Sequence, residues 1–379
     1  MQSKKHLFNI ESGVHYLNCA YMSPLLKSVE DAGIQGVKSK STPWKISPDD
    51  FFAEALEVRR LFAKLTDCTE PERMAMVPSV SYAFANAARN IQVVPGQKII
   101  VLGEQFPSNY YCWEELAREK ELEVVVVHAP VTTYDRGKLW NQAILEAIDS
   151  STALVAMPIV HWSDGTVFDV AAIRKATKEV GAYMVIDGTQ SIGALPFSIQ
   201  EIQPDMLVAA SYKWLLGPYS MGIAYYGKRF DGGTPIEHSW MNRRDAENFS
   251  GLVDYTSEFK PGAARYEVGE HSNFALMPML KKALEDLLTW GPEFVQDYTR
   301  QLLEPVESRI LDLGFSMEDN AYRSSHLFGL RKKGLDIKEL KRTLDKNNIW
   351  VSIRGSSIRV SLNVFNEEED LKVFLNSIV

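Results

Sequence analysis

A lysine begins the loop that follows an apolar run near the middle of the chain. Lys213 comes shortly after the apolar segment 206–209, and a Gly217-Pro218 turn follows it. Most lysines at such places are solvated surface residues, so position alone predicts no chemistry. In a mostly parallel sheet, however, the loops that follow the strands are where ligands bind. Whether Lys213 is a nucleophile or a base therefore depends on the residues around it.

An acidic residue ends another apolar run. Asp187 follows the segment 183–186 and is followed in turn by Gly188, Thr189 and Gln190. A carboxylate buried at this edge of a sheet is costly unless a cation meets it. A protonated pyridine nitrogen is such a cation, and a ring kept in that form withdraws electrons. An aspartate that only caps the following turn is the alternative, and both interpretations stay open for Asp187 alone.

Small hydroxyl residues precede a predicted helix over residues 83–90. Val80 and Ser81 lie in this turn, between Ser79 and Tyr82. The free backbone N–H groups and the dipole of a helix N-terminus attract anions, and a phosphate group fits such a site. A serine before a helix is also a common N-cap, so this turn supports a phosphate site only together with other features.

Two further side chains suit the recognition of a planar, charged ligand. Phe106 lies in the loop after the predicted strand 98–102, with a rigid proline behind it, which suits a ring stacked on a planar cofactor. Arg359 interrupts the apolar strand 358–361, where an unpaired guanidinium would be costly to bury. Core packing of Phe106 and a structural ion pair of Arg359 are the alternatives, and a substrate carboxylate would satisfy Arg359 equally well.

These residues belong to one alternating pattern. Between about residues 97 and 226, amphipathic stretches separate apolar runs at 98–102, 124–127, 154–160, 183–186, 206–209 and 222–226. The stretch 170–180 has Asp169 as N-cap and stops at Gly181, as a helix would. Continuous apolar runs are typical of strands covered on both faces. The predicted fold class is α/β, with a mostly parallel sheet between helix layers.

The pattern changes beyond Pro292. A helix over 294–313, a strand at 327–330, a helix over 337–347, strands around Val351 and at 358–361, and a final helix capped by Asn366 predict a smaller α+β domain. We expect four parts along the chain: an N-terminal segment 1–20, a large α/β domain 21–260, a linking helix and interface segment 261–291, and a small C-terminal domain 292–379.

The composition indicates which classes of molecule the protein can bind. The 379 residues carry a net charge of -8, so the chain has no general attraction for nucleic acid or an anionic membrane surface. No apolar run approaches the length of a membrane span and the first residues are polar, so we expect a cytoplasmic protein that binds small molecules. Its 3 cysteines, Cys19, Cys68 and Cys112, have neither a metal-binding nor a disulfide spacing and are expected to be buried thiols.

Together and in this order, the motifs resemble the class V branch of pyridoxal-phosphate enzymes, which have the fold of aspartate aminotransferase, fold type I. The similarity runs from Tyr16 to the C-terminus. It is most specific at Asp187-x-x-Gln190, at Lys213 after Ser-Tyr, and at Arg359-x-Ser361 followed by Phe-Asn. The branch includes cysteine desulfurases, serine–glyoxylate-type aminotransferases, kynureninases and isopenicillin-N-epimerase-like proteins.

The resemblance implies a pyridoxal 5'-phosphate cofactor and a role for each matching residue. Lys213 would carry the cofactor as a Schiff base, Asp187 would pair with the pyridine nitrogen, and Gln190 would hydrogen-bond the ring hydroxyl. Arg359 would hold the carboxylate of an amino acid substrate. The other cofactor contacts that it implies are Val80, Ser81 and Tyr212 at the phosphate, Phe106 stacked on the ring, and Trp162 where many relatives have asparagine.

The resemblance also implies a homodimer with shared active sites. In the family a segment of the partner subunit closes the phosphate site, and it corresponds here to residues 265–273. Glu270 replaces the usual threonine, so Asn273 or Ser272 is the expected substitute. Trp240 resembles a kynureninase residue that reaches across the same interface.

Several reactions remain open. Residues 351–358 contain no cysteine, which argues against desulfurisation by a thiolate on that loop. The motifs around Phe106 and Lys213 resemble the kynureninase and epimerase-like side of the class. We expect an aminotransferase-like enzyme, with a carbon–carbon or carbon–sulfur lyase, or an epimerase, as the alternatives. A cofactor-binding protein without turnover and a purely structural protein are both disfavoured by the intact Lys213, Asp187 and Arg359.

Overall fold

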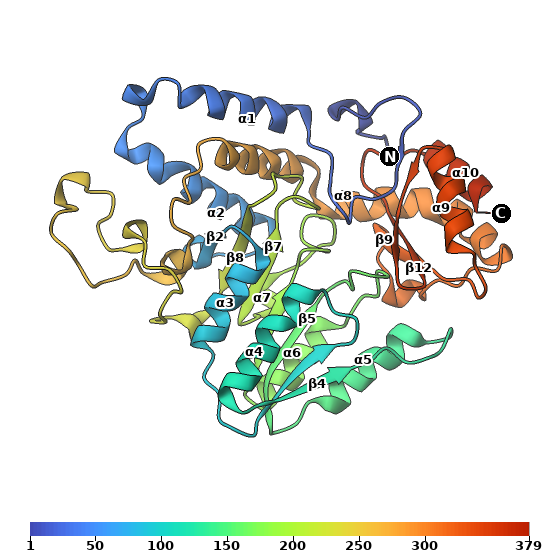
Figure 1. Ribbon diagram of the computed structural model, residues 1–379, viewed down its shortest axis with the longest axis horizontal. Helices are drawn as coiled ribbons and strands as arrows, with labels where there is room; N and C mark the ends of the chain where they lie inside the picture. Colours follow the sequence, from blue (N-terminus) through green and yellow to red (C-terminus); the bar gives the residue numbers. More distant parts are fainter. Residues whose placement is uncertain (379) are drawn as a thin grey trace.

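A seven-stranded sheet forms the centre of the structure, a computed structural model that describes residues 1–378 (Figure 1). The strands lie in the order β2 (Met74–Val77), β8 (Gly222–Tyr226), β7 (Met206–Ala210), β6 (Tyr183–Asp187), β5 (Thr152–Pro158), β3 (Lys98–Leu102) and β4 (Glu123–Val127). The five strands from β7 to β4 run parallel, whereas β8 is antiparallel to both of its neighbours. The predicted mostly parallel sheet is confirmed.

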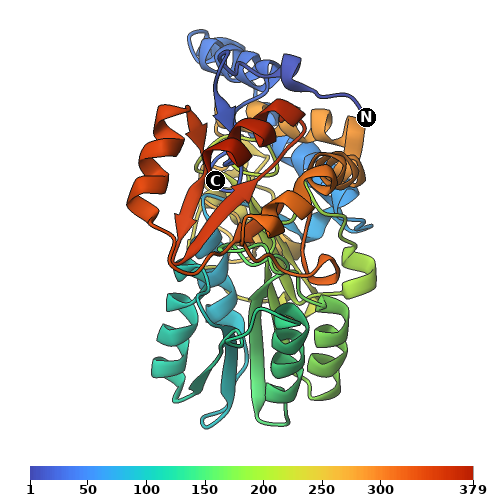
Figure 2. The ribbon, with the colours of Figure 1, turned by 90° about the vertical axis from the view of Figure 1, so that its right-hand side faces the viewer.

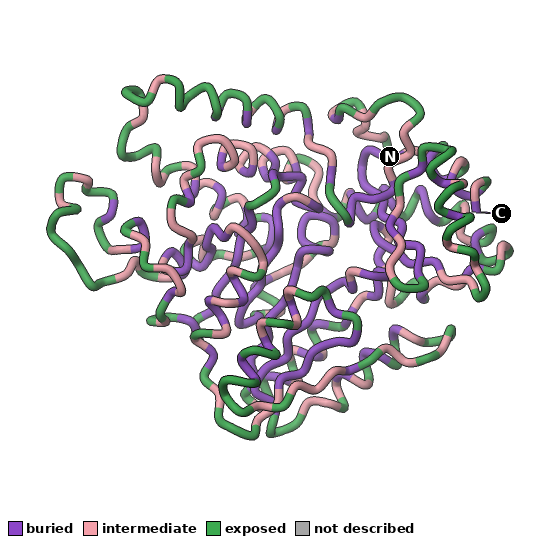
Figure 3. The backbone as a smooth tube through the Cα atoms, in the orientation of Figure 1, coloured by how far each residue is buried: buried purple, intermediate pink, exposed green. Residues whose placement is uncertain are grey.

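Helices cover both faces of this sheet because its strands are apolar on both sides. Ile99 and Val101 of β3 pack into a core with α3 (Val80–Asn90) and α4 (Tyr111–Lys120). Ile100 and Leu102 point to the opposite face. The helices that contribute to the core on that face include α2 (Ala53–Leu65), α5 (Arg136–Ala147), α6 (Val170–Glu179) and the first half of α8 (Leu276–Asp312). Figure 3 shows the strands buried between the two layers.

The C-terminal elements surround a second, three-stranded sheet. Its antiparallel strands lie in the order β11 (Ser352–Arg354), β12 (Ser357–Ser361) and β9 (Leu327–Leu330). The end of α8, α9 (Ile337–Lys346) and α10 (Glu368–Ser377) pack with it around a core of their own. Figure 2 shows these orange and red elements beyond one end of the large sheet.

The N-terminal residues reach across to these C-terminal elements. The strand β1 (His15–Tyr16) pairs in parallel with β10 (Ile349–Trp350), and α1 (Lys27–Ser39) then packs along α8. Leu17 belongs to the C-terminal core, and the backbone N–H of Ser361 donates to its carbonyl at 2.9 Å. Residues from the start of the chain therefore reach the region between the two sheets.

Some predicted element bounds were wrong. The strand expected over 154–160 ends at Pro158, and the helix expected from 294 is the second half of α8, whose backbone breaks at Gly291 with a φ of 75°. The last helix has Glu367 as its cap, because the Glu367 N–H donates to the Asp370 carboxylate at 2.9 Å. Asn366, the predicted cap, instead donates to the Tyr16 carbonyl at 3.0 Å.

Candidate active site

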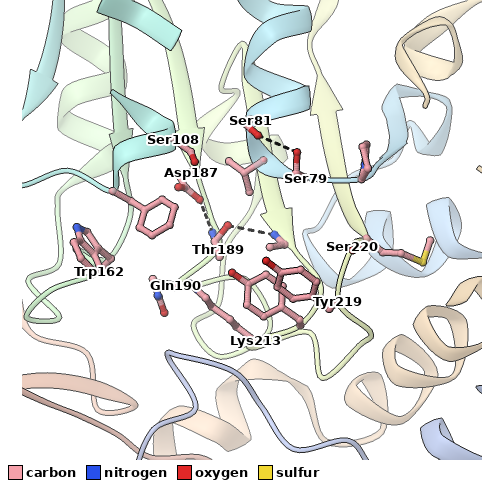
Figure 4. A pocket seen from close by; sticks show the side chains of 16 residues that line it. Ser79, Ser81, Ser108, Trp162, Asp187, Thr189, Gln190, Lys213, Tyr219 and Ser220 are labelled. Carbon is pink, nitrogen blue, oxygen red and sulfur yellow. Dashed lines mark hydrogen bonds between the residues drawn. The ribbon is translucent and has the colours of Figure 1, made fainter. Parts of the chain in front are cut away.

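A cavity of about 350 Å³ opens at the carboxyl ends of the parallel strands. It lies beside β3 and β5, between which the order of the crossover connections reverses, and open α/β sheets bind their ligands at such a point. Its size suits a small organic ligand. Most of the predicted site residues line it: Val80, Ser81, Phe106, Trp162, Asp187, Gln190, Tyr212 and Lys213 (Figure 4).

Lys213 is a buried amine without a salt-bridge partner. Its side chain lies among aromatic rings, with Nζ 5.6 Å from the ring centroid of Phe106 and 5.5 Å from that of Tyr212. Within residues 1–378, no carboxylate lies within 4.0 Å of Nζ and no hydrogen bond holds it. Burial, aided by Arg359, lowers the pKa of this amine to about 8, while Asp187 opposes the lowering. An amine that is partly neutral near neutral pH can act as a nucleophile.

Asp187 is the matching buried acid. It ends β6, is 8% exposed, and one of its carboxylate oxygens accepts from the Thr189 backbone N–H at 3.0 Å (Figure 4). In the described part of the chain, no Lys, Arg or His lies within ion-pair distance of it. Burial raises the pKa of this carboxyl, while the hydrogen bonds from Thr189 and the charge of Lys213 hold it down. Such a carboxylate suits a cationic N–H donor from a ligand.

The N-terminus of α3 closes one end of the cavity. Ser79 is its N-cap, since the Ser79 hydroxyl accepts from the Tyr82 backbone N–H at 3.2 Å. The Ser79 and Ser81 hydroxyl oxygens lie 3.0 Å apart (Figure 4). The other N–H groups of a first helical turn have no partner within the helix, so this turn can receive an anion. Both the capping and the phosphate interpretations of this turn are therefore compatible with its geometry.

Phe106 and Trp162 form an aromatic wall of the cavity. Their rings meet edge to face with centroids 5.4 Å apart, and the Trp162 indole N–H donates to the Glu104 carbonyl at 2.6 Å. Cations or planar rings can pack against the faces of such aromatic side chains. Trp162 therefore borders the cavity.

Gln190 and Tyr212 complete the predicted lining. The Gln190 amide is fixed in orientation, because it donates to the Ala20 carbonyl at 3.1 Å and accepts from the Trp214 indole N–H at 2.9 Å. The Tyr212 ring lies 4.6 Å from that of Tyr219, and burial raises the pKa of its hydroxyl to about 12. Both side chains keep hydrogen-bonding capacity for a ligand.

Arg359 lies behind the aromatic wall and does not line the cavity. It is 1% exposed; one arm of the guanidinium donates to the Trp162 carbonyl at 2.8 Å and the other to the Ser352 hydroxyl at 3.3 Å. Its Nε has no partner, and no carboxylate in residues 1–378 lies within 4.0 Å of it. Burial, with help from the nearby Arg354, lowers its pKa to about 9. A structural ion pair with the described residues therefore does not explain Arg359.

Trp240 and Asn273 do not join the other predicted residues. They line a separate cavity of about 640 Å³, together with Phe51 and Glu270 among others. Trp240 packs against Phe51 with ring centroids 6.5 Å apart. The Asn273 side chain accepts from the backbone N–H groups of the two residues that precede and begin α8. Within one chain, these residues have structural roles.

Sequence reasoning missed several residues of the lining, among them Ser79, Ser108, Thr189, Tyr219, Ser220 and Met221. Thr189 has the clearest role, because its hydroxyl accepts from the Ala210 backbone N–H at 3.2 Å and ties the β6 loop to β7. Its place two residues after the strand-ending Asp187 was the available signal. Tyr219 is 61% exposed, and no feature of the sequence indicated its role.

The side chains around the cavity fit pyridoxal phosphate. A buried amine and a buried carboxylate, both without ion-pair partners in the described residues, share a cavity with aromatic side chains and a helix N-terminus. These groups match an aldehyde, a pyridinium nitrogen, a planar ring and a phosphate, respectively. In the same residues, no cluster of His, Cys, Asp or Glu could hold a metal ion, and no helix has the length and apolar character to cross a membrane.

Comparisons with known proteins identify relatives by sequence and by structure. The chain is 23% identical to the uncharacterized aminotransferase YcbU of Bacillus subtilis, over 95% of this chain and 91% of that protein. It is 24% identical to a kynureninase of Bacillus thuringiensis, over 80% of this chain and 71% of that protein. A solved structure of a C-DES mutant, with glycine covalently linked to the PLP cofactor, superposes with a TM-score of 0.87 at 16% identity, covering 99% of this chain and 98% of that one.

The family model described as aminotransferase class V matches residues 49–374. This match confirms the predicted pyridoxal-phosphate enzyme and its cofactor, and the superposition confirms the fold. The chain belongs to the class V aminotransferase family.

Proposed function

We propose that this protein is an aminotransferase-like enzyme that acts on an amino acid and holds its cofactor covalently through Lys213. The observation that carries the proposal is that Lys213 and Asp187 are both buried in one cavity without an ion-pair partner in residues 1–378. Burying two such groups for stability alone would be unfavourable, because each loses its hydration. A ligand with an aldehyde and a protonated ring nitrogen would satisfy both.

Each side chain then has a defined task. When bound, pyridoxal phosphate supplies an electron-withdrawing ring that stabilises negative charge at the substrate α-carbon. Asp187 keeps the ring nitrogen protonated. Arg359, whose Nε has no partner, binds and orients the substrate carboxylate after Trp162 moves aside, because this indole separates the guanidinium from the cavity. Lys213 would hold the cofactor, and its amine when free would move the proton at the substrate α-carbon.

The half-reaction with a single amino acid tests this function. The holoenzyme is mixed with an amino acid in the absence of an acceptor. The expected result is conversion of the bound cofactor to its amine form, together with one equivalent of the matching 2-oxo acid. An epimerase would instead lose the optical activity of its substrate without consuming it, and this result would contradict the proposal.

A lyase is the second candidate, and the similarity to kynureninase over 80% of the chain favours it. It would release a fragment of the substrate side chain and leave the cofactor in its aldehyde form. A route through a thiolate of this chain has little support. Burial raises the pKa of the Cys19 thiol to about 12, despite a hydrogen bond from Asn363, and residues 351–358 contain no cysteine.

We also propose that the enzyme is a cytoplasmic homodimer with shared active sites. The position of Trp240 and Asn273 supports the shared sites, because these residues do not line the Lys213 cavity of their own chain and could contribute to that of a second copy. Trp240 is 38% exposed and Val37, in the same cavity, is 63% exposed, so this region has apolar surface that a second copy could cover. The cytoplasmic location rests on the composition of the sequence.

A further inference from the structure

A second arginine points to the same side of the small sheet as Arg359. Arg354 ends β11 at a tight hairpin whose first turn residue, Gly355, has a φ of 56°. In the hairpin, Arg354 pairs with Ser357 and Ser352 pairs with Arg359. Directly opposed residues and alternate residues share a face of a sheet, so both arginines lie on one face. A short hairpin thus presents two guanidinium groups side by side.

Both guanidinium groups lie against the indole of Trp162. The central carbon of Arg354 is 5.5 Å from the ring centroid and that of Arg359 is 5.9 Å from it. Trp162 itself borders the cavity that contains Lys213. The charge of Arg354 reaches this cavity, because it contributes to the lowering of the pKa of Lys213.

Arg354 differs from its charged neighbours in having no acidic partner. Arg136 and Arg331 both pair with the buried Asp164, the former at 3.0 Å. In the described residues Arg354 forms no ion pair, and its guanidinium donates a hydrogen bond to the carbonyl of Ile353 at 2.9 Å. Its guanidinium is therefore available for an external anion.

A small cavity of about 200 Å³ lies at Arg354, and residues in contact with Trp162 line it. Trp162 lines the first cavity. Two of its contacts line the second cavity: Glu104, whose backbone carbonyl accepts the hydrogen bond of the Trp162 indole, and Ser163, the next residue in the chain. Ser357 also lines the second cavity. A ligand that reaches past Trp162 would therefore meet Arg354 and serine hydroxyl groups, in a cavity that Arg136, Arg331 and one acidic residue, Glu104, also line.

We propose that the substrate is an amino acid whose side chain carries a second acidic group, and that Arg354 binds this group while Arg359 binds the α-carboxylate. This inference rests on the proposed function. A neutral side chain would leave Arg354 without a counter-charge beside Arg359, whereas a carboxylate or sulfinate accepts charge-assisted hydrogen bonds from it. Arg354 is then the residue that determines side-chain specificity.

Spectral titration of the holoenzyme tests the inference with matched pairs of amino acids. L-Aspartate is compared with L-asparagine, and L-glutamate with L-glutamine, so that each pair differs mainly in charge. The acid of at least one pair should bind about 10- to 100-fold more tightly than its amide. Arg354→Gln should remove this preference by weakening the binding of the acid more than that of its amide, whereas Arg354→Lys should keep part of it.

A control variant and a separate cofactor assay distinguish the possible failures. Arg342→Gln changes an exposed arginine on α9, whose side chain is 73% exposed, and should leave the preference intact. Equal affinities within each pair in the wild type, or a preference that survives Arg354→Gln, would overturn the inference while the response of the cofactor upholds the proposed function. Absence of any response, with no cofactor linked to Lys213 after borohydride reduction, would overturn both.

Discussion

The amine of Lys213 should titrate well below an ordinary lysine in the cofactor-free enzyme. Burial, aided by Arg359, lowers its pKa from 10.5 to about 8, and Asp187 opposes this lowering. At pH 7, a pKa near 8 leaves roughly one amine in ten neutral, against about one in three thousand at 10.5. The neutral amine is the form that attacks an aldehyde, so capture of pyridoxal phosphate should be faster than with an unshifted lysine, whose neutral fraction is roughly 300-fold smaller.

Two substitutions should move this titration in opposite directions. Arg359→Gln removes a positive neighbour and should raise the pKa of Lys213, whereas Asp187→Asn removes a negative neighbour and should lower it further. The assay is the rate of cofactor capture by the apoenzyme, followed by absorbance between about pH 6 and pH 10, and the midpoint of the rate profile gives the pKa. Arg342→Gln, on the exposed side of α9, is the control and should leave the midpoint unchanged.

The reasoning would be refuted by a wild-type midpoint that stays near that of free lysine. It would also be refuted if both variants moved the midpoint the same way, because a charge effect must change sign with the charge removed. Reduced cofactor binding in Asp187→Asn does not obscure the result, since the midpoint is independent of the final occupancy.

Three other predictions concern substrate binding, stability and assembly. Arg359→Lys should raise the apparent KM about 10- to 100-fold and lower turnover with normal cofactor content, because lysine lacks the planar two-armed guanidinium; loss of cofactor or unfolding of the C-terminal elements would instead make Arg359 structural. Burial lowers the pKa of His326 from 6.5 to about 4, so the unfolded chain binds a proton at this residue more tightly than the folded protein does. The free energy of unfolding should therefore fall by roughly 2 kcal/mol as the pH is lowered from about 7 to 5. His326→Gln should flatten this dependence in urea unfolding, and an unchanged slope would contradict it. Sedimentation at assay concentrations should give twice the mass of one chain, and a monomer with full turnover would exclude shared active sites.

Sequence reasoning found the parallel strands because the inner ones are buried on both faces and read as continuous apolar runs, and the half-buried edge strand β4 is a run of valines as well. The edge strand β2 escaped it, since Met74, Ala75 and Met76 have weak strand propensity and only the pairing with β8 makes them a strand. The two-residue pairing of β1 with β10 is a tertiary contact with no local pattern. The change of pattern expected beyond Pro292 lies next to the break in α8 at Gly291, and the linking helix expected within 261–291 is the first half of α8, which begins at Leu276.

The site could be predicted as far as its residues follow strands or carry a charge in an apolar setting. Lys213, Asp187 and Arg359 have such settings, and burial of all three agrees with the sequence reasoning. Arg354 has no such setting in the sequence. An arginine beside a glycine in a hairpin cannot be distinguished from a solvated arginine until the position of the adjacent indole is known. Which arginines are paired is a property of the folded structure alone.

The covalent link at Lys213 is the central claim, and one chemical measurement tests it most directly. The cofactor-saturated enzyme is reduced with borohydride, digested, and its peptides are mapped by mass. The account predicts a phosphopyridoxyl group on Lys213, and no such group in Lys213→Ala treated in the same way. Label on a different lysine of the wild-type chain, or none in a saturated sample, would contradict it.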